Sequence, residues 1–134
     1  MKIWLRAASV LTAVFTLGHS FGTFREPEGA QVPVATMMRA VSFDLLGFPR
    51  TYWGMFVGYG ELMIVTGVLL VVLLWLLSGM AADQVRPLAL AIAIAQAAFA
   101  VIAWRDFFWA PAALNGLSAV CAVIAVTARR GSAP

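Results

Sequence analysis

The chain has 134 residues, of which 63% are hydrophobic and only 11% are charged. A soluble domain of this size needs a surface richer in charge, and the mean hydropathy of +0.93 indicates a protein dissolved in lipid. The net charge of +3 is spread along the chain, so no basic patch predicts nucleic acid as a partner. The single cysteine, Cys121, lies in an apolar run, which excludes a disulfide framework and a cysteine-based metal site.

Four hydrophobic stretches are each long enough for a helix that crosses a bilayer, which takes about 20 mostly apolar residues. They run over about residues 3–24, 51–77, 87–108 and 111–128. Almost no chain separates the last two, so these helices are antiparallel neighbours. We therefore predict an all-α membrane protein with a single integral membrane domain over 1–134. Its four transmembrane helices form an antiparallel bundle.

The first stretch has an alternative interpretation as a cleaved signal peptide. Lys2 and Arg6 form a short basic start, and the string "GHS" offers small residues at a cleavage point. His19 and several threonines are unusual for the apolar core of a signal peptide, and the stretch is long enough to span. These features favour a transmembrane helix.

The segment between the first two stretches is too long for a simple turn. Its beginning, "REPEGAQVP", has the proline, glycine and charge content of a surface loop. Residues 33–47 then place apolar side chains at helical spacing, which predicts a short amphipathic helix on the membrane surface or across the end of the bundle.

The orientation follows from the lysines and arginines that flank the spans. With the amino terminus in the cytoplasm, five basic residues lie inside and four outside. The inside set is Lys2, Arg6, Arg86, Arg129 and Arg130, and the outside set is Arg25, Arg39, Arg50 and Arg105. Most of the outside arginines have acidic residues nearby, so both termini are predicted to be cytoplasmic.

Polar residues form a stripe on the first span. Thr12, Thr16, His19 and Thr23 are spaced by four, three and four residues, which places them on one helix face. The threonines are typical of a seam between helices, because their hydroxyls bond to backbone carbonyls or to a neighbouring helix. His19 is ionisable within a span, which makes it either a functional residue or a hydrogen-bonded structural one.

The string "FPRTYWGMFVGYGE" begins the second span and brings a carboxylate into it. Gly54 and Gly58 lie on the same helix face as Glu61, so Glu61 is predicted to point into the bundle. A second GxxxG motif surrounds His19, and packing of the two glycine faces would bring His19 and Glu61 together. The same faces offer a route to a homo-oligomer, through Gly18, Gly22, Gly54 and Gly58.

The unusual polar and aromatic residues gather in the outer half of the predicted bundle, where they suggest a pocket. The residues predicted to line it are Thr16, Arg50, Tyr52, Trp53, Tyr59, Trp104, Arg105, Asp106 and Asn115. A structural interpretation stands beside this one, with the aromatic residues as an interfacial belt and Arg105–Asp106 as an anchoring ion pair. Gln96, and the pair Asn115 and Ser118, are expected to bond between helices.

Three strings, "LGHSFG", "FDLLGFPRTYWGMFVGYG" and "WRDFF", mark a resemblance that covers nearly the whole chain. In these strings the chain resembles a group of small bacterial four-helix integral membrane proteins that are DoxX-like in size and layout. The resemblance implies a multi-pass protein of the bacterial inner (cytoplasmic) membrane and implies no activity. A looser similarity to the emopamil-binding type of sterol isomerase concerns residue types alone.

Two functions remain open on the sequence. In the first, the pocket binds a membrane lipid or hydrophobic small molecule, and His19 and Glu61 act on it as acid and base in an isomerisation, cyclisation or hydration. In the second, the protein is a non-catalytic structural or accessory subunit whose polar residues set helix register and assembly. Neither interpretation calls for a cofactor or a metal ion.

Overall fold

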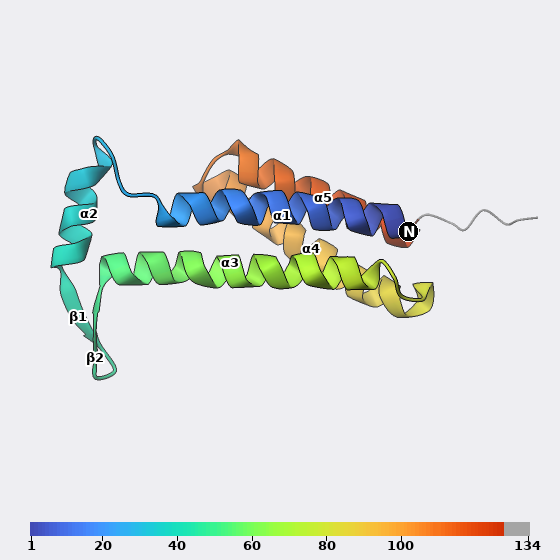
Figure 1. Cartoon of the computed structure of the whole chain (residues 1–134), viewed down its shortest axis with the longest axis horizontal. Helices are drawn as coiled ribbons and strands as arrows, with labels where there is room; N and C mark the ends of the chain where they lie inside the picture. Colours follow the sequence, from blue (N-terminus) through green and yellow to red (C-terminus); the bar gives the residue numbers. More distant parts are fainter. Residues whose placement is uncertain (128–134) are drawn as a thin grey trace, which may run out of the picture. The chain divides into compact units, whose positions relative to one another are not determined.

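A computed structural model describes residues 1–127 of the chain (Figure 1). The predicted end of the fourth span at residue 128, and Arg129 and Arg130, lie outside the described residues. The elements are α1 (Lys2–Phe24), α2 (Gln31–Ala40), β1 (Ser42–Leu45), β2 (Phe48–Thr51), α3 (Tyr52–Leu77), α4 (Ala82–Asp106) and α5 (Trp109–Thr127).

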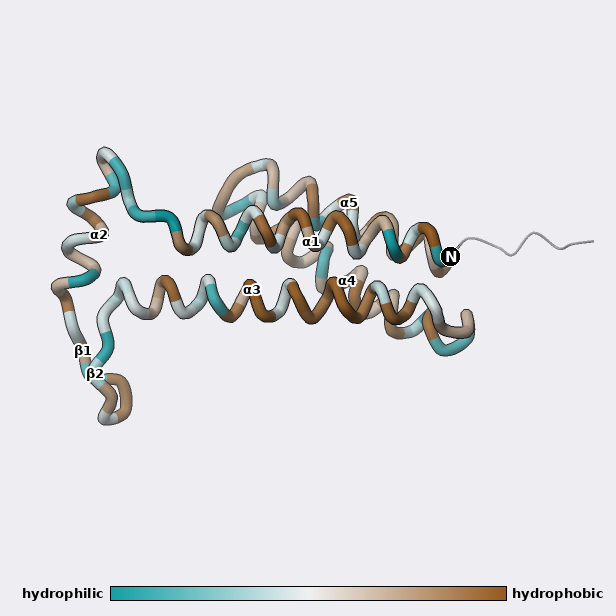
Figure 2. Tube along the Cα trace, viewed as in Figure 1, coloured by the Kyte–Doolittle hydropathy of each residue, from teal (hydrophilic) through white to brown (hydrophobic). Residues whose placement is uncertain are grey.

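Four of the helices, α1, α3, α4 and α5, are long and apolar enough to cross a membrane. Figure 2 shows the apolar character of α3 along most of its length and the hydrophilic connection between α1 and α2. The helices agree closely with three of the predicted spans. The other helix, α4, begins five residues before Pro87, because Asp83 in its first turn suits the positive end of the helix dipole and the proline is accommodated inside the helix.

The predicted amphipathic segment 33–47 has two parts in the structure. Its first part lies in α2, which ends at Ala40, and its second part belongs to an antiparallel hairpin in which Leu45 pairs with Phe48. The helix α2 ends where the backbone of Val41 becomes extended, with φ −82° and ψ 112°. Pro49 lies on β2 and has no N–H to donate to a neighbouring strand. A two-stranded ribbon consists of edge strands, where proline is tolerated.

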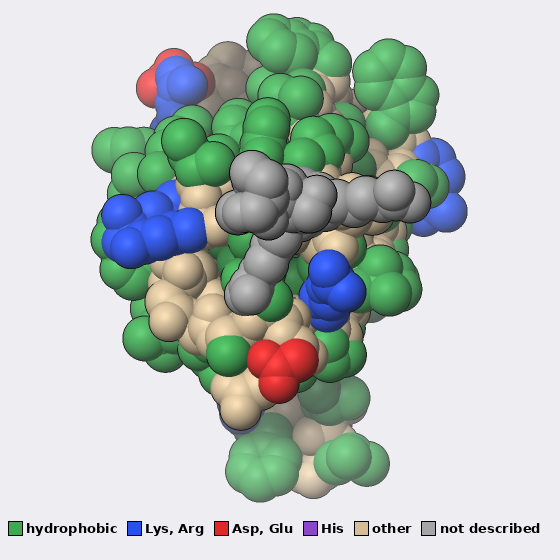
Figure 3. Space-filling view, turned by 90° about the vertical axis from the view of Figure 1, so that its right-hand side faces the viewer, with side chains coloured by type: hydrophobic (Ala, Val, Ile, Leu, Met, Phe, Trp, Pro, Cys, Tyr) green, Lys and Arg blue, Asp and Glu red, His purple; other side chains and the backbone are tan. Residues whose placement is uncertain are grey.

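The chain divides into two compact units, which are described separately. Among the described residues, one unit comprises 1–16 and 67–127. Its apolar core joins α1, α3, α4 and α5, through Leu5, Ala8, Leu74, Leu77, Val85, Ala89, Ile92 and Ala125. Small residues in this set let helix backbones approach closely. Figure 3 views the end where residue 1 and the α3–α4 turn lie, and basic side chains there are spread among hydrophobic ones.

The other unit is Leu17–Thr66. It contains the last turns of α1, the whole of α2 and the hairpin, and the first turns of α3. In the view of Figure 1, α2 and the hairpin run transverse to α3 at its N-terminal end. Thr51 joins the hairpin to α3, and its Oγ1 accepts a hydrogen bond from the Gly54 backbone N–H at 3.0 Å. This is an N-cap, which fixes where the helix begins.

Candidate functional site

The residues predicted to form a site are divided between the two units. Leu17–Thr66 holds His19, Arg50, Tyr52, Trp53, Tyr59 and Glu61, and the other unit holds Thr16, Trp104, Arg105, Asp106 and Asn115. Each group is therefore considered within its own unit.

Within the Leu17–Thr66 unit, His19 lies on α1 and Glu61 lies on α3. The Nε2 atom of His19 is 3.3 Å from the backbone oxygen of Gly60, the residue before Glu61. The side chain of His19 is half-buried, whereas Glu61 is exposed. Within residues 1–127, Glu61 takes part in no ion pair or side-chain hydrogen bond. The structure thus brings His19 to the backbone beside Glu61 and leaves the carboxylate facing outward.

The closest glycine contact in this unit is at Gly60. A Cβ atom added there would overlap the side chain of Thr23, which is buried. By contrast, a Cβ at Gly18, Gly22 or Gly58 would meet nothing within 4 Å. The close approach therefore uses a different glycine from the predicted GxxxG faces. Those faces are open in this chain, and their use in a homo-oligomer remains a prediction.

Tyr52 and Trp53 hold the hairpin and α2 to the start of α3. The Tyr52 ring lies 4.8 Å from the ring of Phe43 on β1. The guanidinium of Arg39, on α2, lies 4.4 Å from the centre of the Trp53 ring and donates to Glu26 Oε2 at 2.8 Å. Both aromatic residues were predicted to line a pocket. In the structure they anchor the hairpin and α2.

Replacing Arg39 with glutamine should loosen α2 from α3 without unfolding the chain. The change removes a cation–π contact and a partly exposed ion pair, each worth on the order of 1 kcal/mol or less. We expect amide hydrogen exchange in α2 to become roughly fivefold faster. Arg25→Gln is the matched control, because within residues 1–127 Arg25 pairs only with Glu28, three residues away, and both side chains are well exposed. Equal exchange in the two variants would contradict the anchoring role.

A buried hydrogen-bond network occupies the interior of the other unit. Thr12 Oγ1 on α1 accepts from Gln96 Nε2 on α4 at 2.8 Å and donates to the backbone oxygen of Ala8 at 2.8 Å. Ser118 Oγ on α5 lies 3.0 Å from Thr12 Oγ1 and also reaches the Ala8 oxygen at 3.2 Å. The expectation that Gln96 and Ser118 bond between helices is confirmed. Thr12, on α1, is the residue of this network that contacts both α4 and α5.

Two amide oxygens in this unit have no hydrogen-bond partner among the described residues. They are Gln96 Oε1 and Asn115 Oδ1, and both side chains are almost fully buried. The expectation that Asn115 also bonds between helices is wrong, because its Nδ2 donates to the backbone oxygen of Pro111, one turn earlier in its own helix α5. An unpaired buried acceptor costs free energy of folding. These two oxygens are therefore places where the interior of the unit lacks hydrogen bonds.

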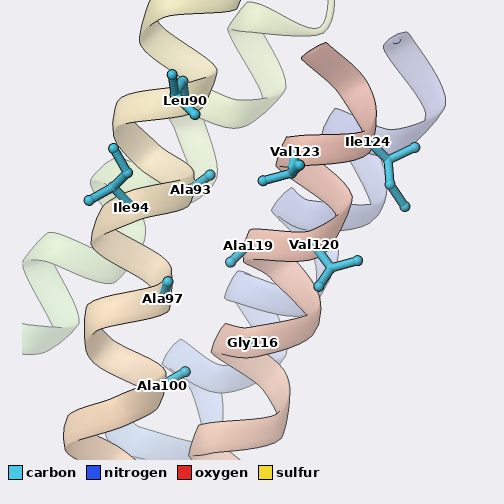
Figure 4. Close-up of a pocket in the computed structure, with 10 residues that line it drawn as sticks. All are labelled: Leu90, Ala93, Ile94, Ala97, Ala100, Gly116, Ala119, Val120, Val123 and Ile124. Atoms are coloured by element: carbon cyan, nitrogen blue, oxygen red, sulfur yellow. The ribbon is translucent and has the colours of Figure 1, made fainter. Parts of the chain in front are cut away.

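The groove between α4 and α5 is apolar. It has a volume of about 470 Å³, and Figure 4 shows the side chains of both helices along it. Its lining residues are Leu90, Ala93, Ile94, Ala97, Ala100, Gly116, Ala119, Val120, Val123 and Ile124. None of the residues predicted to line a pocket is among them. The groove offers shape and apolar contact but no acid, base or hydrogen-bonding side chain.

The remaining predicted residues of this unit are at its surface, except Thr16. Arg105 and Asp106 form a two-pronged ion pair, with Nε–Oδ1 and Nη2–Oδ2 distances of 2.9 and 2.7 Å. Trp104 beside them is 73% exposed. Such an arrangement fits the anchoring role that the sequence analysis set beside the pocket. Thr16 is buried and donates to the backbone oxygen of Thr12 at 2.8 Å.

No protein-family model, curated protein or solved structure matches the chain. Within residues 1–127, no group of three or more His, Cys, Asp or Glu side chains is placed to hold a metal ion.

Proposed function

We propose that the protein is a four-span integral membrane protein that binds a hydrophobic molecule through the carboxylate of Glu61. The ligand is a lipid or small apolar molecule that carries a hydroxyl or another hydrogen-bond donor. The resemblance to DoxX-like bacterial proteins supports the same architecture in the bacterial inner membrane. The distribution of lysine and arginine around the spans supports a cytoplasmic position for both termini.

The exposure of Glu61 is the observation that carries this proposal. Glu61 lies in the tenth position of α3, a helix of 26 residues that is long and apolar enough to cross a membrane. Its neighbours Tyr59, Leu62 and Val65 are also exposed. A carboxylate on such a surface is costly in contact with lipid tails. A ligand that donates a hydrogen bond to Glu61 and covers the apolar neighbours removes that cost.

His19, on α1, supplies a second polar group. Its Nε2 atom lies 3.3 Å from the backbone oxygen of Gly60, the residue before Glu61 on α3. A carboxylate and an imidazole next to a bound molecule are the groups that acid–base chemistry requires. An isomerisation, cyclisation or hydration of the ligand would use Glu61 and His19 in these roles.

The second candidate function is that of a structural or accessory subunit. The hydrogen bonds among Thr12, Gln96 and Ser118 favour it, because they fix the register of α1, α4 and α5 without a ligand. On this function, the exposed Glu61 pairs with a basic or hydrogen-bonding residue of another subunit.

Native mass spectrometry of the gently purified protein tests the proposal, with Glu61→Gln compared with wild type. We expect a specific co-purifying molecule on wild type that falls at least tenfold on the variant, because the neutral amide is a weaker acceptor than the carboxylate. Glu28→Gln is the control, since Glu28 lies in the exposed connection between α1 and α2.

Two results would count against ligand binding. Equal amounts of the same lipids on wild type and on Glu61→Gln would remove Glu61 from the site. An apo oligomer whose stoichiometry changes in the variant would assign Glu61 to subunit assembly and support the second function.

A further inference from the structure

The tip of the β1–β2 hairpin has an unusual residue in its turn. Leu45 pairs with Phe48, so Leu46 and Gly47 form a two-residue loop. Both have positive φ angles, 54° and 87°, and the Gly47 N–H donates to Asp44 Oδ1 at 2.8 Å. This is the backbone of a tight hairpin turn that favours asparagine, aspartate or glycine at both central positions. Leucine at the first of them is disfavoured, because its side chain crowds the left-handed backbone.

The side chain of Leu46 has no compensating contact in the described part of the chain. It is 92% exposed, and Leu45 and Phe48 beside it are 46% and 60% exposed. Three apolar side chains thus project from a turn where polar residues are the usual choice. The pattern is explained if an apolar phase outside the chain receives them.

A basic residue stands at the base of this tip. The guanidinium of Arg50 lies 5.5 Å from the centre of the Phe48 ring and donates to the backbone oxygen of Pro49. Arg50 is exposed, and it belongs to none of the ion pairs formed within residues 1–127. Asp44 in the same hairpin accepts from the Gly47 N–H and forms no ion pair with Arg50 in the described part of the chain. Apolar side chains next to such an unpaired cation match the boundary between lipid tails and phosphate groups.

The position of the hairpin in its unit suits the same boundary. The hairpin lies at the N-terminal end of α3 and transverse to it (Figure 1), and Tyr52 and Trp53 follow it directly in the chain. These are the residue types that mark the interface of a membrane helix. If α3 crosses the bilayer, the hairpin lies in the plane of the membrane surface.

We infer that the hairpin tip, residues 45–48, inserts into the lipid surface and that Arg50 binds a lipid phosphate. This rests on the proposed function only in requiring that α3 crosses a membrane; it does not depend on a ligand at Glu61. The hairpin is then a membrane-surface contact additional to the four spans, selective for bilayers that contain anionic lipid.

Site-specific fluorescence in lipid nanodiscs tests the inference. An environment-sensitive fluorophore is attached at position 46 in a Leu46→Cys variant, with Cys121→Ala to remove the native thiol, and quenching by spin-labelled lipids is measured. Glu28→Cys is the control for an exposed position, and Val65→Cys, 66% exposed on α3, is the control for a lipid-facing span. We expect quenching at position 46 to be several times that at position 28. Including anionic lipid should raise it about twofold, and Arg50→Gln should abolish that increase.

The possible results separate this inference from the proposed function. Strong quenching at position 65 with none at position 46 overturns the hairpin inference and keeps α3 as a span. Absence of quenching at both positions overturns the membrane-spanning architecture as well. A label at position 46 that is protected from an aqueous quencher, yet not quenched by lipid, would assign the tip to a second protein chain and also overturn the inference.

Discussion

Substituting Gly67 by alanine should destabilise the protein, although alanine is the better helix former. A Cβ atom at this position would overlap Thr16, whose Oγ1 and Cγ2 both lie against Gly67. Thr16 is buried and its hydroxyl is bonded to the Thr12 oxygen, so it cannot rotate away without breaking that bond. Overpacking of this kind costs about 1–3 kcal/mol, against a gain of up to about 1 kcal/mol in helix propensity.

The matched control for this prediction is Gly58→Ala on the same helix. A Cβ there meets nothing within 4 Å, so only the gain in helix propensity should be seen. The free energy of unfolding is measured by titration with a denaturing detergent in mixed micelles. The double variant Gly67→Ala with Thr16→Ala, which restores the space, should recover part of the loss. If Gly67→Ala proved as stable as Gly58→Ala, the close contact would not exist.

Thr12→Val should be the most damaging change in the hydrogen-bond network. Valine has nearly the shape of threonine, but it removes the acceptor of Gln96 Nε2 and the hydroxyl that reaches Ala8 and Ser118. Because Gln96 is fully buried, its amide would be left without a partner, at a cost of about 1–3 kcal/mol. Thermal unfolding in detergent, followed by near-ultraviolet circular dichroism, measures the loss.

A second substitution separates the network from simple packing. Gln96→Leu removes both the donor and the unpaired Oε1 atom, and Thr12 keeps its bond to Ala8. We expect this variant to be close to wild type in stability. The double variant Thr12→Val with Gln96→Leu should be more stable than Thr12→Val alone, because no buried amide is then left unpaired. A double variant less stable than Thr12→Val would show that the cost lies in packing.

The helices were predictable from sequence because hydrophobic length alone defines them. The span expected over residues 51–77 corresponds to α3, Tyr52–Leu77, within one residue. The hairpin was not predictable in the same way, since residues 33–47 carry apolar side chains at helical spacing through the point where the helix ends. Its turn lacks the Asn-Gly or Asp-Gly pair that signals a hairpin. The only local signal was Gly47 followed by Pro49.

The contacts of the polar residues were only partly predictable. The spacing of Thr12, Thr16 and Thr23 placed them on a seam, and all three are buried. The glycine that each threonine contacts depends on how both helices are rotated about their axes. The spacing of residues within one helix does not determine that rotation. The structure uses Gly60 and Gly67, each opposite a threonine, where the GxxxG pattern indicated Gly54 and Gly58. The structure places the His19 ring at the backbone of Gly60, beside Glu61, and a joint action of His19 and Glu61 on a ligand stays a prediction.

The separation in sequence of the network partners has a consequence for biosynthesis. Thr12 bonds to residues 84 and 106 positions later in the chain. On the proposed topology, α1 enters the lipid long before α4 and α5 have been translated. Until then, the hydroxyls of Thr12 and Thr16 donate hydrogen bonds to backbone oxygens of their own helix. These two hydroxyl donors are therefore paired in α1 before α4 and α5 are present. The contacts of Thr12 on α1 are therefore complete only after α5 has been synthesised.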